Sequence, residues 1–217
     1  MTEVLYRWPT AAQFGRVVPK TKFYEHGSVS TAVREKFVVE VQRITWAYKL
    51  AESTINLPGS AEVPEIQVFQ IESKGDDVAE PVLTAIDKAV RTPIIFEVHR
   101  ADGHVRMTAS LKLIGATAKL GTYYTTSWLP NDSARQQLPA AITLTALYTT
   151  LVQSLSPVGA RPGEDLADAA TRMEAVRKLE REIASLQRKL RNEPQFNRKV
   201  EIRRVLKTKQ SELEQQR

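Results

Sequence analysis

Hydrophobic residues recur at steps of three and four in the segment that follows Ser30. Such spacing places one apolar stripe on a helix, and a serine just ahead of the stripe is a common N-cap. We therefore expect a helix over residues 30–49. The stripe consists of Val33, Phe37, Val41, Ile44 and Tyr48.

Residues that favour β-structure dominate four later segments. Val, Ile, Phe, Tyr and Thr suit a pleated, half-buried surface. Strands are therefore expected at 65–74, 93–100, 104–114 and 119–129. The sequence Ala-Asp-Gly at 101–103 is typical of a hairpin turn, and Pro81 near the start of an apolar stripe predicts a helix over residues 78–90. A helix, a strand, a helix and then several strands indicate an α+β (α/β-like) body with a mixed or antiparallel sheet.

The C-terminal part of the chain predicts further helices separated by breakers. Helical apolar spacing returns over residues 139–155, and it continues at coiled-coil spacing over residues 166–190. Because Pro194 interrupts a helix, we expect two helices that fold back as an antiparallel hairpin. The apolar residues after this break are Phe196, Val200, Ile202, Leu206 and Leu213. The predicted parts are an α+β body at 1–155, a Pro- and Gly-rich linker at 156–164 and a helical hairpin at 165–217.

Composition narrows the class of protein. Of the 217 residues, 42% are hydrophobic and 26% are charged, which is close to the globular average and predicts a folded core. The length allows one full domain with an appendage, or two small domains. The absence of cysteine excludes disulfides, thiolate catalysis and cysteine-based metal sites. No stretch has the apolar length of a signal-peptide core or of a membrane span. We expect a cytoplasmic protein that does not contact a membrane.

Basic residues concentrate near the C-terminus. The net charge is +6, and residues 161–217 hold 15 basic against 10 acidic residues. Within residues 188–209 the numbers are nine against two. Such a patch neutralises nucleic-acid phosphates or meets an acidic partner protein, and the alternative is a helix face that is charged only for solubility. The candidate binding residues are Arg188, Lys189, Arg191, Arg198, Lys199, Arg203, Arg204 and Lys207.

The sequence lacks most motifs that define enzymes. Its three histidines, His26, His99 and His104, are too dispersed to predict a metal cluster. The last two flank the predicted turn with Asp102, and we expect a structural role for them. The chain contains no phosphate-binding loop, no dinucleotide-binding glycine motif and no nucleophile elbow. We therefore expect no cofactor.

One acidic motif resembles part of a known active site. The strand at 65–74 ends with Glu72, a serine and Lys74, and Glu-x-Lys at a strand end resembles the catalytic half-motif of PD-(D/E)xK nucleases. In such a site the carboxylate binds Mg²⁺, the lysine activates water, and a second carboxylate comes from the preceding strand. The short extended piece that we expect upstream offers Asn56 instead. Catalysis by Glu72 and Lys74 with Mg²⁺ is the alternative to a strand end without chemistry.

Three stretches of the chain together resemble an uncharacterised bacterial family, known as a domain of unknown function. The similarity runs from about Phe23 to Leu213, and its most specific segments are RITWAYKLAESTINLP and QFNRKVE. Members of that family occur beside DNA methyltransferase and helicase genes in anti-phage defence islands. The resemblance therefore implies an accessory restriction or defence role, but no active site. Pro194 and Arg203 depart from the lysine and asparagine expected in the C-terminal motif.

These observations lead to one functional expectation. The protein is expected to be an accessory, non-catalytic subunit of a DNA-targeting defence system. Its basic hairpin would bind DNA or RNA, a protein partner such as a helicase or methyltransferase subunit, or both. The alternative is the Mg²⁺-dependent nuclease, and a third interpretation is a scaffold that self-associates through its coiled coil.

Overall fold

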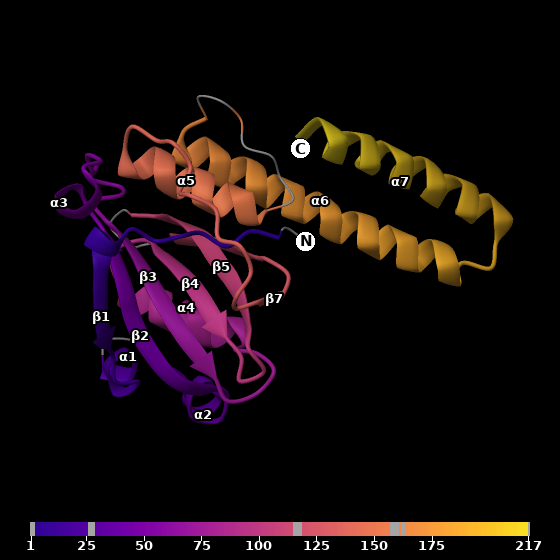
Figure 1. Cartoon of the computed structure of the whole chain (residues 1–217). Helices are drawn as coiled ribbons and strands as arrows, with labels where there is room; N and C mark the ends of the chain where they lie inside the picture. Colours follow the sequence, from indigo (N-terminus) through magenta and orange to yellow (C-terminus); the bar gives the residue numbers. More distant parts are fainter. Residues whose placement is uncertain (1–2, 26–28, 115–118, 157–160, 162–163, 217) are drawn as a thin grey trace.

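The computed structural model of the chain describes residues 3–25, 29–114, 119–156, 161 and 164–216. Within these residues seven strands form one open sheet, and helices cover both of its faces (Figure 1). The strands are β1 (Gln13–Val17), β2 (Val41–Leu50), β3 (Ile66–Ser73), β4 (Ile94–His99), β5 (His104–Leu113), β6 (Lys119–Thr125) and β7 (Leu129–Pro130). The helices are η1 (Thr10–Ala12), α1 (Thr21–Glu25), α2 (Thr31–Glu40), α3 (Glu52–Ile55), α4 (Glu80–Ala89), α5 (Leu144–Leu155), α6 (Leu166–Asn192) and α7 (Phe196–Gln216).

The sheet is mixed. Its order is β1-β2-β3-β4-β5-β6, with β7 beside β5. β3 and β4 run parallel and the other neighbouring pairs are antiparallel. Parallel neighbours need a crossover connection, and α4 supplies it. The α+β class with a mixed sheet and a C-terminal helix pair is confirmed, and so is the hairpin turn, in which Gly103 has a φ of +82°.

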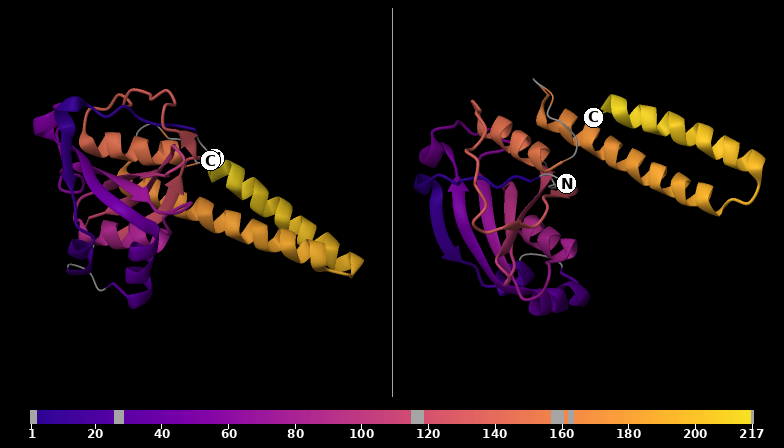
Figure 2. Two further views of the ribbon diagram at one scale, coloured as in Figure 1. Left: turned by 60° about the horizontal axis from the view of Figure 1, so that its bottom comes forward. Right: turned by 45° about the vertical axis from the view of Figure 1, so that its right-hand side comes forward.

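Each face of the sheet carries its own hydrophobic core. On one face α1, α2 and α4 pack on residues such as Ile44, Phe69 and Phe96. On the other face the N-terminal segment, α5 and the first half of α6 pack on residues such as Val68 and Ile95. Figure 2 shows these layers from two further sides. The alternation of side chains along a strand explains how one strand feeds both cores.

The predicted helix at 30–49 is wrong in its second half. Ser30 is the N-cap as expected, but the helix ends at Glu40 and residues 41–50 form β2 without an intervening loop. Two β-bulges in the pairing of β2 with β3 give burial at every third residue, which imitates a helical stripe. The bulge at Ala47 also reverses the faces, so Trp46 joins the α4 core whereas Tyr48 joins the α5 core.

Two lysines explain why α2 stops at this point. Lys20 Nζ donates to the carbonyl oxygens of Phe37, at 3.2 Å, and of Val41. Lys74 Nζ donates to the Val38 oxygen at 2.7 Å, and the Lys74 backbone N–H donates to the Glu40 oxygen at 2.8 Å. Cations that bind the last carbonyls of a helix compensate the partial negative charge at its C-terminus, and they therefore stabilise the helix end at this position.

Two further elements differ from the expectation. The helix predicted at 139–155 begins only at Leu144, because Thr143 is its N-cap and accepts a hydrogen bond from Ala146 N–H at 3.1 Å. The piece expected to be extended around Asn56 is the single turn α3, which ends at Asn56 with a φ of 54°. The strands predicted at 65–74, 93–100 and 104–114 and the helix predicted at 78–90 are present with small changes at their ends, whereas the strand predicted at 119–129 ends at Thr125 and Leu129 belongs to the separate strand β7.

The predicted linker lies mostly outside the described residues, which include only Ser156, Arg161 and Glu164 of it. Glu164 joins α5 to α6, because its carboxylate accepts hydrogen bonds from Gln153 at 3.0 Å and from Arg172 Nε at 2.6 Å. The division into two parts at this point stays a prediction. None of the described helices has the length and apolar character needed to cross a membrane.

Candidate nucleic-acid interface

The hairpin that carries the basic patch begins within the core of the body. α6 begins after its N-cap Asp165, whose carboxylate accepts a hydrogen bond from Asp168 N–H at 2.8 Å. Leu166, Met173 and Val176 of its first half are buried in the core on the α5 side of the sheet. The second half of α6 extends away from the body together with α7, as both views in Figure 2 show.

α7 returns along α6 and is fixed at its C-terminal end. Glu193 Oε1 accepts a hydrogen bond from Gln195 N–H at 3.0 Å, which closes the turn around Pro194. The last carbonyls of α7 accept hydrogen bonds from Arg161 at 2.9 Å and from Arg172 at 3.2 Å. The helix break expected at Pro194 is therefore present, and the turn is the end of the hairpin farthest from the body (Figure 1).

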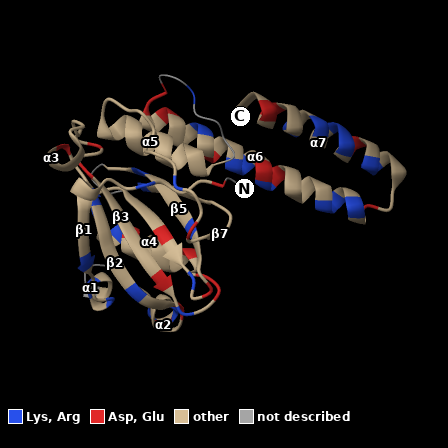
Figure 3. Ribbon diagram, in the orientation of Figure 1, with Lys and Arg blue, Asp and Glu red and all other residues tan. Residues whose placement is uncertain are grey.

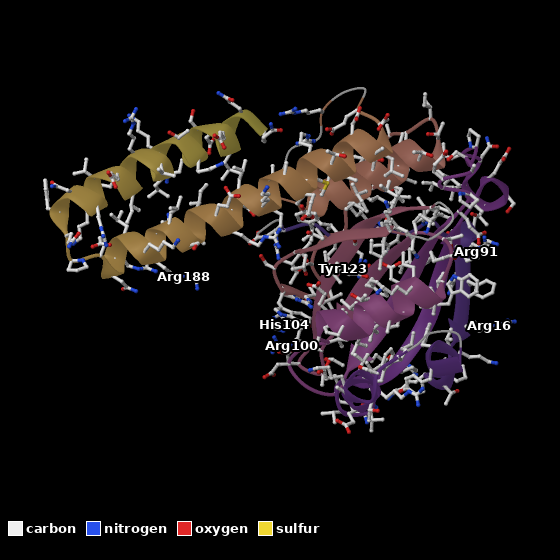
Figure 4. All side chains as sticks on the ribbon, turned by 180° about the vertical axis from the view of Figure 1, so that it is seen from behind. Arg16, Arg91, Arg100, His104, Tyr123 and Arg188 are labelled. Carbon is white, nitrogen blue, oxygen red and sulfur yellow. The ribbon has the colours of Figure 1, made fainter. Side chains whose placement is uncertain are left out.

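The eight predicted binding residues all lie on this hairpin. Seven of them are exposed and Lys199 is half-buried. None of the eight forms an ion pair with another residue in the described part of the chain. Figure 3 shows their distribution along α7 and the distal part of α6, and Figure 4 labels Arg188 near the turn. Their positive charge is thus available to an external anion.

Lys209 differs from these eight residues because its charge is neutralised by ion pairs. It belongs to the same basic segment of the sequence, but its ammonium lies 3.2 Å from Glu182 of α6 and 2.9 Å from Glu212 of α7. These two carboxylates raise the pKa of Lys209 through hydrogen bonds, first from Glu212 and then from Glu182. Lys209 therefore stabilises the contact between the helices instead of adding to the exposed charge.

Two apolar residues of α7 are not where the sequence pattern put them. Phe196 and Val200 were expected on the buried stripe, but they are 72% and 48% exposed. At about 100° per residue, the face that meets α6 contains Ile202, Leu206 and Leu213, whereas Phe196 and Val200 fall on the outer face. That outer face, which we call the outer stripe, consists of Phe196, Val200, Arg203, Arg204 and Lys207. A helical projection of the sequence would have found it.

A polar hollow lies beside the turn. Its volume is about 360 Å³ and both helices contribute to its lining. The lining residues are Ser185, Arg188, Lys189, Asn192, Glu193 and Ile202. Two of the predicted binding residues thus border a recess at the distal end of the hairpin.

The nuclease half-motif is engaged in contacts within the protein. Glu72 lies near the end of β3, and its cross-strand neighbour on β2 is Arg43, whose Nε donates to the Glu72 carboxylate at 2.9 Å. A cation thus occupies the place where a metal site requires a second carboxylate. Lys74 holds the last turn of α2 through its bond to the Val38 carbonyl. The structure gives both residues contacts that favour a stabilising role.

The histidines do not build a metal site in the described residues, where no group of three or more His, Cys, Asp or Glu side chains is arranged to hold a metal ion. His104 Nδ1 lies 3.1 Å from Asp102 in the turn, and His99 Nδ1 lies 3.2 Å from the Asn131 amide oxygen. His26 falls outside the described residues. The structural role expected for His99 and His104 agrees with these contacts.

A buried carboxylate holds the N-terminal segment on the sheet. Glu97 of β4 is fully buried, and its carboxylate accepts hydrogen bonds from Trp8 at 2.8 Å, Gln70 at 3.0 Å and Arg135 at 2.6 Å. Burial alone would raise the pKa of Glu97, but His99, Arg135 and Gln70 together lower it to about 2. His99 Nε2 lies 3.6 Å from the carboxylate, longer than a hydrogen bond, so Arg135 and Gln70 hold it more directly.

We expect this site to make the protein sensitive to acid. Because the pKa of Glu97 lies below its ordinary value of 4.5, its contribution of about 3 kcal/mol to stability is complete above that value and is lost as the pH falls toward 2. Urea unfolding of Glu97→Gln from pH 6 to 2 should show a flatter pH dependence than the wild type. Glu35→Gln, at an exposed position, is the control and should keep the wild-type curve. Equal slopes in all three proteins would contradict the assignment.

The fold and the hairpin define the class of protein: an α+β body with a mixed sheet that carries a basic, antiparallel helical hairpin. The chain belongs to the family DUF4391, a domain of unknown function, whose model matches residues 7–213. No curated protein and no solved structure matches the chain. The family match covers both the body and most of the hairpin.

Proposed function

We propose that this protein is an accessory, non-catalytic subunit of a DNA-targeting anti-phage defence or restriction system, and that its hairpin binds nucleic acid, a partner protein or both. The observation that carries the proposal is the set of eight cations on the hairpin that have no ion pair among the described residues. A cation that is already neutralised releases no counterions from a nucleic acid, whereas an unpaired one does.

Two further features support the proposal. The hairpin extends from a body that fixes its base, so the distal part of both helices is open to a large partner (Figure 2). The outer stripe combines cations with Phe196, and aromatic rings among cations favour stacking on bases. The resemblance to proteins found beside methyltransferase and helicase genes suggests a cytoplasmic helicase or methyltransferase subunit as the protein partner.

The second candidate is a Mg²⁺-dependent nuclease that uses Glu72 and Lys74. Its support is the order of elements, because β2, β3, α4 and β4 follow one another as an antiparallel pair, a crossover helix and a parallel strand. The ion pair of Glu72 with Arg43 and the bond of Lys74 to α2 weigh against it. We therefore place it second.

A single assay separates the two candidates. The purified full chain and Glu72→Ala are incubated with single- and double-stranded DNA and RNA, with and without Mg²⁺, at two salt concentrations. Salt-sensitive binding without cleavage supports the accessory role. Mg²⁺-dependent cleavage that disappears in Glu72→Ala would establish the nuclease, and the absence of both binding and cleavage would contradict a nucleic-acid interface.

A further inference from the structure

An apolar pocket lies on the side of the sheet that α4 covers. It has a volume of about 350 Å³, which falls in the range of sites for small molecules. Its walls come from α1, β2, β3 and the C-terminal end of α4, and Phe23, Trp46 and Phe69 contribute aromatic rings to the lining. Figure 4 shows Arg91, one of the lining residues, at the end of the body opposite Arg188 of the hairpin. The pocket is therefore separate from the basic patch.

The bulge in β2 creates the aromatic wall. If residues 46–48 ran as a regular strand without the bulge, Trp46 and Tyr48 would point to the same face of the sheet. Because of the bulge, the indole of Trp46 faces the ring of Phe69, with an angle of 10° between the ring planes and 5.9 Å between the centroids. Phe14 packs against Trp46 at 4.3 Å and holds the indole from the edge of the sheet. The wall is rigid because both neighbours fix its orientation.

The polar atoms next to these rings are already bonded to each other. The indole N–H of Trp46 donates to the Gln67 side-chain oxygen at 2.7 Å, and the Gln67 amide nitrogen donates to Thr92 Oγ1 at 3.1 Å. Gln67 is 1% exposed, so its bonds are protected from water. An occupant consequently meets ring faces and aliphatic groups, and its inner part needs to be flat and apolar.

One cation of the pocket lining is available to an occupant. Glu65 is neutralised by Lys49, whose ammonium lies 2.6 Å from its carboxylate. Arg91 also lines the pocket, is exposed and has no ion pair within the described residues. The outer part of an occupant is therefore expected to carry a negative charge that Arg91 attracts.

We propose that this pocket binds a small planar aromatic acid, with its ring against Trp46 and Phe69 and its carboxylate or phosphate toward Arg91. This ligand site does not depend on the hairpin. Its occupation would give the body a function of its own, and a variant that abolishes binding by the hairpin would leave it intact.

The test uses the full chain and three probes in calorimetry and saturation-transfer NMR: indole-3-carboxylate, its neutral analogue indole-3-carboxamide, and adenosine monophosphate. We expect at least one acid to bind about tenfold more tightly than the neutral amide, because a charge-assisted bond adds to the ring contact. Preference for adenosine monophosphate would identify a phosphate ligand, and preference for indole-3-carboxylate an organic acid. Failure of both acids to bind at millimolar concentration would overturn the proposal.

Two variants and one control variant test whether the ligand binds in this pocket. Arg91→Glu reverses a charge at the pocket and should lower the affinity for the acid about tenfold. Lys88→Glu makes the same change in net charge at an exposed position of α4 that does not line the pocket, so it should leave the affinity unchanged. Ala89→Phe should fill the space and block both acids, with an unchanged unfolding midpoint as the check on folding. Equal losses in Arg91→Glu and Lys88→Glu, or binding that survives Ala89→Phe, would contradict the site.

Discussion

A variant that lacks four cations of the hairpin is expected to bind nucleic acid much more weakly, with the slope of its salt dependence reduced by up to about four, since each neutralised phosphate contributes roughly 0.9. The four changes are Arg198→Gln, Lys199→Gln, Arg203→Gln and Arg204→Gln. None of these side chains has an ion pair among the described residues, so glutamine removes charge without leaving an internal partner unpaired. Fluorescence anisotropy with labelled DNA at several salt concentrations measures the slope.

The control removes the same charge from the body. Arg7, Arg16, Arg34 and Lys88 are exposed, and they too have no ion pair in the described part of the chain. Their replacement by glutamine should change the affinity through net charge alone and leave most of the slope. If the hairpin variant binds like the wild type, or if the control variant loses as much affinity and slope as the hairpin variant, the hairpin is not the interface.

The second large effect concerns the stability of the body. Lys112 is fully buried, and its ammonium lies 2.7 Å from the Asp87 carboxylate while it donates to the carbonyl oxygens of Asp87 and Val90, at 2.6 Å each. Lys112→Met would remove the cation beside the buried Asp87 carboxylate, which would keep its hydrogen bond from Tyr123, and would remove a donor from the last carbonyls of α4. We expect a loss of about 3–5 kcal/mol in the free energy of unfolding, measured in urea at pH 7.

The environment of Asp87 provides the controls. Burial raises the pKa of Asp87 even though Lys112 opposes the shift, so the carboxyl of the variant should become neutral in mild acid. The loss caused by Lys112→Met should therefore shrink as the pH falls, and Asp87→Leu in the same chain should restore part of the stability. Lys119→Met, at an exposed position of β6, should change stability by no more than about 0.5 kcal/mol. A loss below about 1 kcal/mol in Lys112→Met would refute the role of the pair.

The residues of β2 were predicted from the sequence to be helical, and this prediction was wrong. The apolar residues of 41–50 continue the three- and four-residue spacing of α2, so a helical period is the natural inference from the chain alone. The true cause of that spacing is a pair of bulges that depend on pairing with β3. The capping of α2 by Lys20 and Lys74 depends likewise on residues far away in sequence.

In the candidate sites too, some features were visible in the sequence and others depend on tertiary contacts. The eight cations were identified from the sequence because charge density is a local property of composition. That they form no ion pair with another described residue, in contrast to Lys209, could not be predicted, because it depends on which helix faces meet. The Glu72 motif was visible in the sequence as well, but its pairing with Arg43 across β2 required the register of the sheet. The aromatic pocket had no local signal, since its rings come from three separate elements.

The sequence by itself determined the properties that arise from near neighbours in the chain: the strands at 65–74, 93–100 and 104–114, the hairpin turn, the helix break at Pro194 and the concentration of basic residues beyond it. Only the tertiary structure decided the ending of α2, the face to which Trp46 points, and which charges are neutralised. The physical reason is that backbone periodicity and net charge are local, whereas register, burial and ion pairing are set by residues brought together from distant parts of the chain.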